Sequence, residues 1–459
     1  MEHLLLFLVC LRNNWVFVPF NYKLKPEDLK IKIKTIDLDL LLFNDSYWSN
    51  PYIDFENVIP KEYILEQSKF RKEFILWKKE NTTLEKKLFN DITNTDELSN
   101  SGEEADLIYL STSGTTGSSK IARLSRRMIF WNNISTCIYW GLDSNDSTLI
   151  HTPLYHAGGL NVFTTPLLFC GGTLILHSVF NPQNVISSMK EKLINILFAV
   201  PTMFNMLIAH PEFSDLDMSH MKFLITGGAP CPQKLYDYFQ SKGVNFKQGF
   251  GMTEAGVNCF FIPNTKVASS YIGTVGVPMP FCFMSLIDEN KNEIHGEGEG
   301  ELCIRGPLLF SGYLEEDNSV YHPTLGFKSG DIFYRNEDGY YFVVGRRKEI
   351  IIRGGENIHP LEIEFILQAH PDVKEVSVIG KQDELWGEIP VMFLVLNKSY
   401  TQDEVLELGK YIKTKIAPHK IPREIYLLDS MPLNSTGKID KLKLKEMLNN
   451  NSLNPVLKY

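Results

Sequence analysis

The chain has 459 residues, of which 44% are hydrophobic and 22% are charged, and its net charge at pH 7 is −9. This length allows two or three domains with well-filled cores, and the composition is that of an ordinary globular protein. The negative charge gives no basic footprint for nucleic acid. Seven widely spaced cysteines form neither a Cys-x-x-Cys pair nor a cluster with zinc spacing, so we expect reduced, mostly buried thiols in a cytoplasmic protein.

The sequence opens with an apolar run at residues 3–11 that superficially resembles a secretory signal. Glu2 stands where a signal peptide carries basic residues, and the segment after Arg12 is no small-residue cleavage site. We therefore expect a buried helix. No apolar run is long enough for a membrane-spanning helix, so no integral membrane segment is expected.

Short apolar runs then alternate with amphipathic stretches through much of the chain. Buried strands are expected at Leu107–Ser111, Thr148–Thr152, Gly172–Leu176 and Lys222–Thr226. Helices are expected between them at Pro182–Lys192 and Pro232–Lys242. This alternation predicts an α/β fold with largely parallel sheets. The charged stretch Lys61–Asn100 is typical of a solvated helix or loop.

The pattern changes toward the C-terminus. Residues 298–344 combine short apolar runs with glycine-containing turns. Beyond a boundary at residues 345–348, strands are expected at Asp372–Gly380 and Ile389–Val395, and a helix at Thr401–Ile416. The sequence therefore predicts a second, smaller domain.

The most informative segment is the loop from Ser111 to Lys120, which follows the first of these strands. Its glycines let backbone amides converge on phosphate oxygens, its hydroxyls add donors, and its lysine adds positive charge. The Gly114–Gly117 spacing is too short for the common Gly-x-x-x-x-Gly-Lys-Ser/Thr loop. The segment predicts a phosphate loop of another kind, with a Ser/Gly-rich surface turn as the alternative.

This loop resembles the signature loop of the adenylate-forming superfamily, which includes acyl-CoA synthetases, luciferases and peptide-synthetase adenylation domains. Ser119 and Ile121 replace a proline and a glycine that are common there, and neither change removes a donor. The resemblance implies contacts to the ATP phosphates from Thr112, Ser113, Gly114, Thr115, Thr116, Gly117 and Lys120.

Further segments follow in the order that the superfamily has. Residues 155–160 resemble the segment whose histidine, here His156, lies beside the acyl pocket. Residues 227–230 resemble the segment along the adenine, which implies nucleotide contacts from Gly228, Ala229 and Pro230. Small residues at these positions let a flat ring approach the backbone.

Residues 249–254 resemble the next family segment. The resemblance implies that Phe250 stacks on adenine with Gly251 beside it, that Thr253 contacts the α-phosphate, and that Glu254 holds Mg²⁺. Magnesium favours carboxylate and phosphate oxygens and keeps several waters, so one protein carboxylate is sufficient. A core position is the alternative for Phe250.

Three later positions complete the resemblance. Asp331 matches the aspartate that accepts hydrogen bonds from the ribose, and Arg346 matches an arginine that reaches the ribose or phosphates. Lys438 matches the lysine that closes over the site during adenylation. A cation is needed there because the attacking carboxylate and the α-phosphate are both anions. The implied catalytic residues are Lys438, His156, Thr253 and Glu254.

The loop with Gly354, Gly355 and Glu356 resembles the loop that lines the pantetheine tunnel of CoA ligases, and Trp386 fits the same group. The resemblance implies an AMP-forming acid–CoA ligase that uses ATP, Mg²⁺, CoA and a fatty or aryl acid. Three alternatives stay open: an o-succinylbenzoate–CoA ligase, an acyl-AMP ligase that loads a carrier protein, and a non-catalytic nucleotide-binding relative.

The resemblance also predicts domain organisation. We expect a large domain of stacked α/β sheets at residues 1–345, a hinge at residues 346–348 centred on Lys348, and a small mobile α+β domain at residues 349–459. Leu8–Pro19 with Asn21 resembles a segment well inside the family's large domain, which predicts that the usual front part is lacking or that the start is misplaced. The oligomeric state stays open, and a homodimer fits the family.

Overall fold

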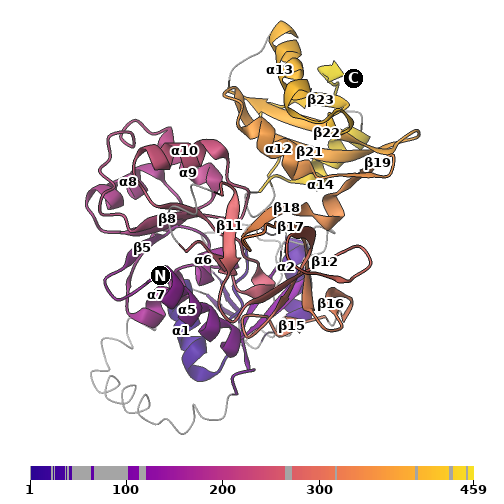
Figure 1. Cartoon of the computed structure of the whole chain (residues 1–459). Coiled ribbons are helices and arrows are strands. Elements are labelled where there is room, and N and C mark those ends of the chain that lie inside the picture. The colour runs from indigo at the N-terminus through magenta and orange to yellow at the C-terminus, as the bar shows by residue number, and fades with distance from the viewer. Residues whose placement is uncertain are drawn as a thin grey trace, which may run out of the picture.

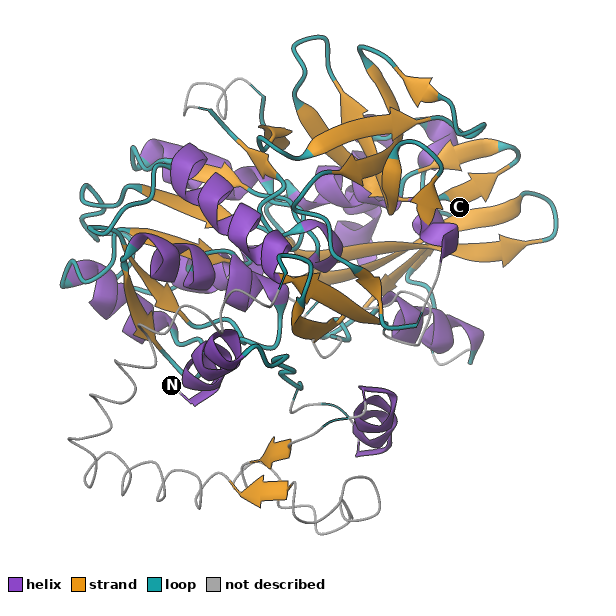
Figure 2. Ribbon diagram, turned by 90° about the horizontal axis from the view of Figure 1, so that it is seen from below, coloured by secondary structure: helices purple, strands orange, loops and turns teal. Residues whose placement is uncertain are grey.

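The computed structural model describes residues 2–21, 24, 26–36, 38, 41–43, 64–66, 102–112, 120–263, 271–315, 318–397, 402–433, 438–450 and 453–459. In these ranges the chain forms a larger body and, from about residue 350 onward, a smaller body above it (Figure 1). Viewed from below, helices gather on one side of the molecule and most strands on the other (Figure 2). No described helix is both long and apolar enough to cross a membrane.

A five-stranded parallel sheet lies at the centre of the larger body. Its strand order is β6 (Thr173–Leu176), β5 (Ser147–Ile150), β7 (Ile196–Ala199), β8 (Phe223–Thr226) and β9 (Phe246–Gln248). One face packs on α8 (Pro182–Lys190), α9 (Pro201–Ile208) and α10 (Gln233–Ser241). The other face packs near α5 (Arg126–Trp140) and α7 (Thr164–Cys170). Burial on both faces explains why these strands are continuous apolar runs, and the predicted parallel α/β unit is confirmed here.

The second large sheet is antiparallel. Its order is β10 (Phe260–Phe261), β11 (Thr274–Pro278), β18 (Tyr341–Arg346), β17 (Gly326–Arg335), β14 (Gly298–Arg305), β12 (Phe283–Ile287) and β13 (Glu293–Ile294), with β16 (Tyr321–His322) beside β17. A three-stranded antiparallel sheet holds β15 (Gly312–Tyr313), β4 (Ile121–Ser125) and β3 (Asp106–Ser111). The prediction of largely parallel sheets is therefore wrong for these two sheets, whose neighbouring strands run antiparallel and need no crossover helices.

The N-terminal helix α1 (Glu2–Asn13) is only half buried. Leu4 and Phe7 pack inward, and the Phe7 ring meets Phe17 with centroids 5.8 Å apart. The prediction of a buried helix is wrong for the opposite face, where four apolar side chains are exposed: Leu5, Leu8, Val9 and Leu11. Helix α2 (Pro26–Ile36) and the parallel pair β1 (Leu41–Phe43) and β2 (Ile64–Glu66) follow. Apart from β2, the stretch 61–100 lies outside the described residues.

The smaller body is α+β, as the sequence predicts. Its sheet runs β20 (Glu356–Ile358), β19 (Ile351–Arg353), β22 (Gly387–Leu396), β23 (Glu424–Leu427) and β24 (Leu457–Lys458), with β21 (Val373–Asp383) also paired to β22. Helices α12 (Pro360–Gln368) and α13 (Gln402–Lys415) share one apolar core with the sheet, and α14 (Lys441–Asn449) shares another. The predicted strands and helix at residues 372–416 are confirmed to within a few residues.

The seven cysteines are free thiols. Five of them are buried and Cys10 and Cys170 are partly exposed, which confirms the prediction of mostly buried, reduced cysteines.

Candidate active site

The carboxyl ends of the parallel strands meet at one edge of the central sheet, where α/β proteins commonly bind ligands. His156 lies in the loop after β5, half-buried at the start of the short helix α6 (Ala157–Asn161). Its ring packs against Tyr155 with centroids 4.6 Å apart. A side chain at Gly158 would lie 3.7 Å from the Phe198 ring on β7. The predicted acyl-pocket histidine therefore sits above the middle of this edge.

Glycines allow two neighbouring segments to run close together at the same edge. The Gly249 amide donates to the Thr226 carbonyl at 2.7 Å, and a Cβ on Gly227 would lie 3.2 Å from the Gly249 carbonyl oxygen. A Cβ on Gly251 would lie 1.9 Å from the Val257 carbonyl oxygen, so the turn accepts only glycine there. Gly228 (φ +79°) and Ala229 are exposed, and Pro230 is partly exposed. This is the shape predicted for a backbone that lies along a flat ring.

The phosphate loop is held closed at its base. The Thr112 amide donates to the Lys120 carbonyl at 2.8 Å, and the Thr112 hydroxyl donates to the same oxygen at 3.2 Å. Strands β3 and β4 thus form an antiparallel hairpin with the loop at its tip. The predicted phosphate contacts of Ser113, Gly114, Thr115, Thr116 and Gly117 lie outside the described residues.

Glu254 is the buried carboxylate of the site. It lies in the 3₁₀ turn η5 (Thr253–Ala255), and its Oε1 accepts a hydrogen bond from the Tyr313 hydroxyl at 2.8 Å. Burial raises the pKa of Glu254, and the hydrogen bond from Tyr313 opposes that shift. Lys120 Nζ lies 4.8 Å from the centroid of the same Tyr313 ring. A carboxylate in this position belongs to the donor type that Mg²⁺ prefers, so the residues present fit the ion.

Asp331, Arg346 and Lys438 form the second charged group. Asp331 on β17 is buried, and its Oδ1 lies 3.1 Å from Arg346 Nε on β18. Burial raises the Asp331 pKa, against the opposing charges of Arg346 and Lys438. Lys438 belongs to the smaller body and is exposed, yet the charges of Arg346 and Asp331 act on its ammonium. Desolvation there lowers the Lys438 pKa, Arg346 adds to this shift, and Asp331 opposes it.

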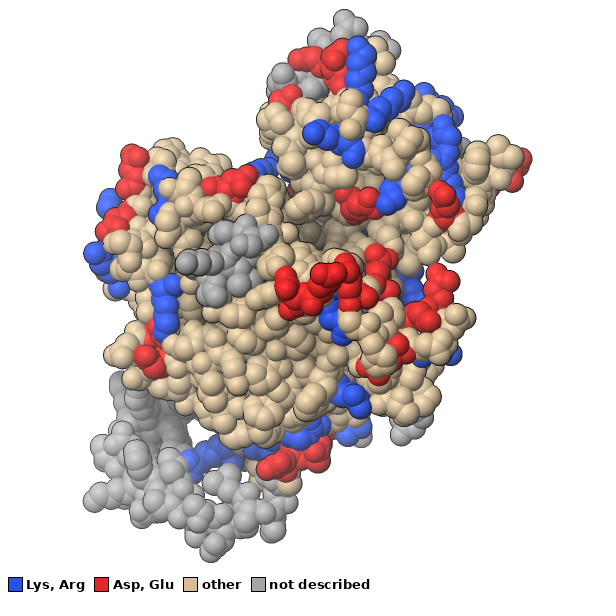
Figure 3. Space-filling model, viewed as in Figure 1, with Lys and Arg blue, Asp and Glu red and all other residues tan. Residues whose placement is uncertain are grey.

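The two charged groups are coupled to each other. The Glu254 pKa is lowered by Arg346 and raised by Asp331. The surface between the two bodies is hollowed, and acidic side chains gather on the rim of the larger body (Figure 3). Glu254, Asp331, Arg346 and Lys438 come from distant segments, yet they are close enough for their charges to interact.

Three other residues were predicted for the site: Phe250, Thr253 and Lys348. Phe250 is partly buried and meets Phe333 edge to face at 4.9 Å, so it contributes to the core. Thr253 is half-buried at the start of the turn that carries Glu254. Lys348 is exposed in the turn η7 (Arg347–Glu349) between β18 and β19, a position compatible with a hinge. The roles of these residues stay predictions.

The predicted CoA loop lies in the smaller body, between β19 and β20. Gly354 (φ +59°) and Gly355 (φ +89°) turn the chain between β19 and β20, and Glu356 follows. The Gly354 amide donates to the Trp386 carbonyl at 2.8 Å, and the Arg353 guanidinium lies 5.0 Å from the Trp386 ring. Strand β19 stands on the outer side of the smaller body, whereas β17 and β18 lie at the cleft (Figure 1).

Sequence reasoning missed Tyr313 and Phe198. Tyr313 is distant in sequence from both groups that its side chain contacts, and Phe198 is one apolar residue in an apolar strand. The one local signal is Gly312-Tyr313 after a buried apolar run, which does not by itself specify a partner.

Comparison with known proteins identifies the class. The AMP-binding enzyme family matches residues 1–314, and the AMP-binding enzyme C-terminal domain matches residues 362–438. The chain belongs to the AMP-binding enzyme family. It is 34% identical over 336 residues to a feruloyl-CoA synthase from Amycolatopsis sp, covering 73% of this chain and 68% of that protein. It is 32% identical to a 2-succinylbenzoate–CoA ligase from Bacillus licheniformis, covering 74% of this chain and 70% of that protein.

Solved structures agree and add information on domain arrangement. ATP-bound MatB from Rhodopseudomonas palustris has a TM-score of 0.82 at 25% identity, covering 98% of this chain and 87% of that one. The apo form of MatB, with the same identity and coverages, has a TM-score of only 0.70. The o-succinylbenzoate CoA synthetase from Bacillus subtilis in complex with ATP and magnesium has a TM-score of 0.80 at 25% identity, covering 97% of this chain and 87% of that one. The structure here is therefore more similar overall to the ATP-bound MatB than to the apo form.

Proposed function

We propose that this enzyme joins a carboxylic acid to CoA in two steps. The acid carboxylate attacks the α-phosphorus of ATP and releases pyrophosphate, which gives an acyl-adenylate. The CoA thiol then attacks the acyl carbon and releases AMP. The observation that carries the proposal is the convergence of Lys120, Glu254, Asp331, Arg346 and Lys438 on one cleft.

Each of these charged residues would contact a different part of the substrates. Lys120 and the phosphate loop would bind the triphosphate, and Asp331 would accept hydrogen bonds from the ribose. Lys438 would approach the carboxylate and the α-phosphate together. A fixed cation there lowers the activation barrier that arises because the two reacting groups are both anions and repel each other. The ion pair between Arg346 and Asp331 supports this scheme, because it holds the arginine beside the residue that would bind the ribose.

Glu254 would hold Mg²⁺, with Tyr313 orienting its carboxylate. When bound with ATP, the ion would supply charge neutralisation at the phosphates. The raised pKa of Glu254 is expected, because burial disfavours the charged carboxylate until a cation binds beside it.

For the second step, the loop Gly354–Glu356 would line the path of the pantetheine arm. Strand β19, which leads into that loop, stands on the outer side of the smaller body here, so the smaller body would rotate about residues 346–348 between the steps. The likeness to the ATP-bound form of MatB supports assignment of this arrangement to the adenylation step.

We further propose an aryl acid as the substrate. The support is that the relatives named above act on ferulate and 2-succinylbenzoate, and that the Phe198 ring lies beneath Gly158 near His156. A fatty acid is the second candidate.

The test is exchange of labelled pyrophosphate into ATP with a panel of aryl, fatty and dicarboxylic acids, with and without Mg²⁺. We expect acid-dependent and Mg²⁺-dependent exchange, highest with an aryl acid, and a CoA thioester detectable by mass when CoA is added. Accumulation of acyl-AMP despite added CoA would instead indicate a carrier protein as acceptor. Folded protein that binds ATP but exchanges nothing would support the non-catalytic alternative.

A further inference from the structure

Tyr313 stands at a junction between two parts of the site that come from distant segments. It lies on β15 opposite Ala122 of β4, the strand that begins directly after Lys120. The Leu314 amide donates to the Ile121 carbonyl at 2.8 Å. On the other side, the Phe310 amide donates to the Glu254 carbonyl at 2.9 Å. The backbone around Tyr313 is therefore tied both to the phosphate-loop hairpin and to the turn that carries Glu254.

The side chain of Tyr313 makes the same two connections. Its hydroxyl donates to Glu254 Oε1 at 2.8 Å, and the ammonium of Lys120 lies 4.8 Å from the centre of its ring. The Phe310 ring supports the phenol edge to face at 5.0 Å. One half-buried residue thus contacts the carboxylate through its hydroxyl and the cation through its π-face.

We propose that Tyr313 is a positioning residue that fixes the Glu254 carboxylate for Mg²⁺ and the Lys120 ammonium for the ATP phosphates, an inference that rests on the proposed function. A hydroxyl that donates to a buried carboxylate restricts its rotation and keeps it in the charged form without neutralising it. The negative face of the ring attracts the ammonium but leaves its N–H groups able to reach an anion. Tyrosine supplies both effects, whereas phenylalanine supplies only the second.

The test separates these two contacts by measuring ATP binding calorimetrically, with and without Mg²⁺, on the full chain. Tyr313→Phe removes the hydroxyl and keeps the ring. We expect the Mg²⁺ concentration for half-maximal ATP binding to rise about tenfold, which is the scale for losing a hydrogen bond to a charged group, with Mg²⁺-free ATP binding unchanged. Tyr313→Leu removes both contacts, and we expect Mg²⁺-free ATP binding to weaken several-fold as well.

Tyr321→Phe is the matched control. Tyr321 is also partly buried, packs its ring on Phe327 at 5.9 Å, and acts on the Glu254 charge only through space. We expect ATP binding by Tyr321→Phe to depend on Mg²⁺ as it does in the unmodified protein. If Tyr313→Phe leaves the Mg²⁺ dependence unchanged, the inference is overturned. It is also overturned if Tyr313→Phe lowers the melting temperature and weakens ATP binding equally with and without Mg²⁺, since that is a purely structural effect.

Failure of the proposed function would be visible separately. The unmodified protein would then bind Mg²⁺-ATP without exchanging pyrophosphate for any acid. The comparison between Tyr313→Phe and Tyr321→Phe would still decide whether Tyr313 positions the two groups.

Discussion

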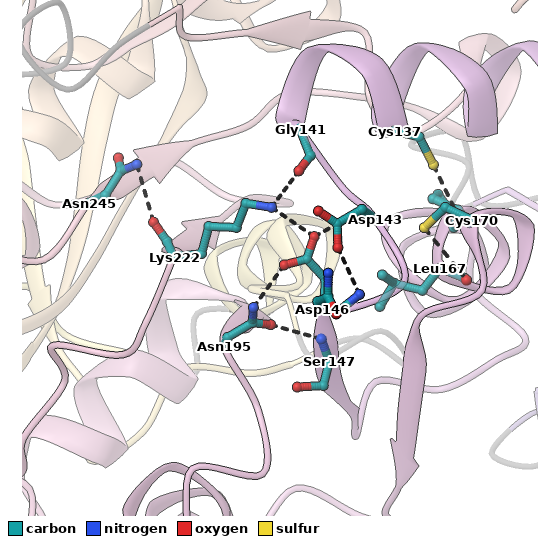
Figure 4. A network of polar contacts seen from close by, with 12 residues as sticks. Cys137, Gly141, Asp143, Asp146, Ser147, Leu167, Cys170, Asn195, Lys222 and Asn245 are labelled. Atoms are coloured by element: carbon teal, nitrogen blue, oxygen red, sulfur yellow. Dashed lines mark hydrogen bonds and ion pairs between the residues drawn. The ribbon is translucent and has the colours of Figure 1, made fainter.

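The two ends of the central parallel sheet use polar residues in opposite ways. At the amino end, the buried Asp146 accepts hydrogen bonds from Lys222 Nζ (2.8 Å), from Asn195 Nδ2 (2.8 Å) and from the Asp143 amide (2.9 Å) (Figure 4). The Asn195 Oδ1 accepts from the Ser147 amide at 2.8 Å. This network ties together the starts of β5, β7 and β8, and its members satisfy one another.

Beyond the carboxyl end, burial shifts the pKa values of several polar groups. His151 follows β5 and is 4% exposed. Burial, with a smaller contribution from His177, lowers its pKa to about 4, and a backbone hydrogen bond with Leu149 opposes this shift. Glu254 and Asp331 have raised pKa values for the same reason, desolvation. The groups at the amino end pair with one another and hold the sheet together, whereas those beyond the carboxyl end have pKa values shifted by desolvation, which is common at functional sites.

The largest effect is expected from Lys438→Ala at the cleft. Loss of one preorganised cation at the transition state should slow pyrophosphate exchange by roughly 10²–10³-fold, while the melting temperature stays unchanged. Thioester formation from supplied acyl-AMP should be largely spared. Lys443→Ala, at an exposed lysine on α14, is the control and should exchange normally. A large loss in both half-reactions would indicate damage to folding or domain docking.

Asp146→Ala tests the amino end. It leaves the Lys222 ammonium and the Asn195 amide without their buried acceptor, which should lower the free energy of unfolding by about 3 kcal/mol. Because Lys222 is 35% exposed, water recovers part of the loss. Urea unfolding measures the change, and exchange activity per folded molecule should be unaffected. Lys192→Ala removes a 3.8 Å pair between exposed side chains and leaves the hydrogen bond from the Ser219 amide to Asp217 in place, so it should leave the unfolding midpoint nearly unchanged.

The pH dependence of stability tests His151. Its pKa in the folded chain, about 4, lies below the ordinary value of 6.5, so the unfolded chain takes up the proton first as pH falls. His151 therefore does not change the free energy of unfolding above pH 6.5. It lowers that free energy between pH 6.5 and 4, by about 2 kcal/mol at pH 5.

Urea titrations at pH 7 and pH 5 measure how far the free energy of unfolding falls with pH. His151→Leu should remove the part of this fall that His151 causes. His295→Gln, at an exposed histidine, should retain it. An unchanged decline in His151→Leu would contradict the assignment of the pH effect to this residue.

The smallest effect is expected for a contact across the cleft. Asn357 Nδ2 of the smaller body donates to Glu289 Oε1 of the larger body at 3.2 Å, and both groups are exposed. Asn357→Ala should slow pyrophosphate exchange by about twofold, because an exposed hydrogen bond contributes little to holding this arrangement. A loss above tenfold would mean that Asn357 acts on the reaction itself.

Several features of this protein follow from local sequence. The strands at residues 148–152, 172–176 and 222–226 are continuous apolar runs between turn residues, and the structure places strands there with shifts of one or two residues. The Gly251 turn and the hairpin after Ser111 are equally local, because they depend on which residues fit a given backbone. The ordered motifs were enough to indicate the family.

Only the tertiary structure decided the rest. Periodicity reports that a segment is buried, but not which segment covers it, so it could not distinguish the antiparallel sheet from a parallel one or reveal the exposed face of α1. The contacts Asp146–Lys222, Tyr313–Glu254 and Asp331–Arg346 join distant or separately predicted segments. Their partners are fixed by strand order and register, which depend on packing across the whole chain and leave no pattern in any one stretch of sequence.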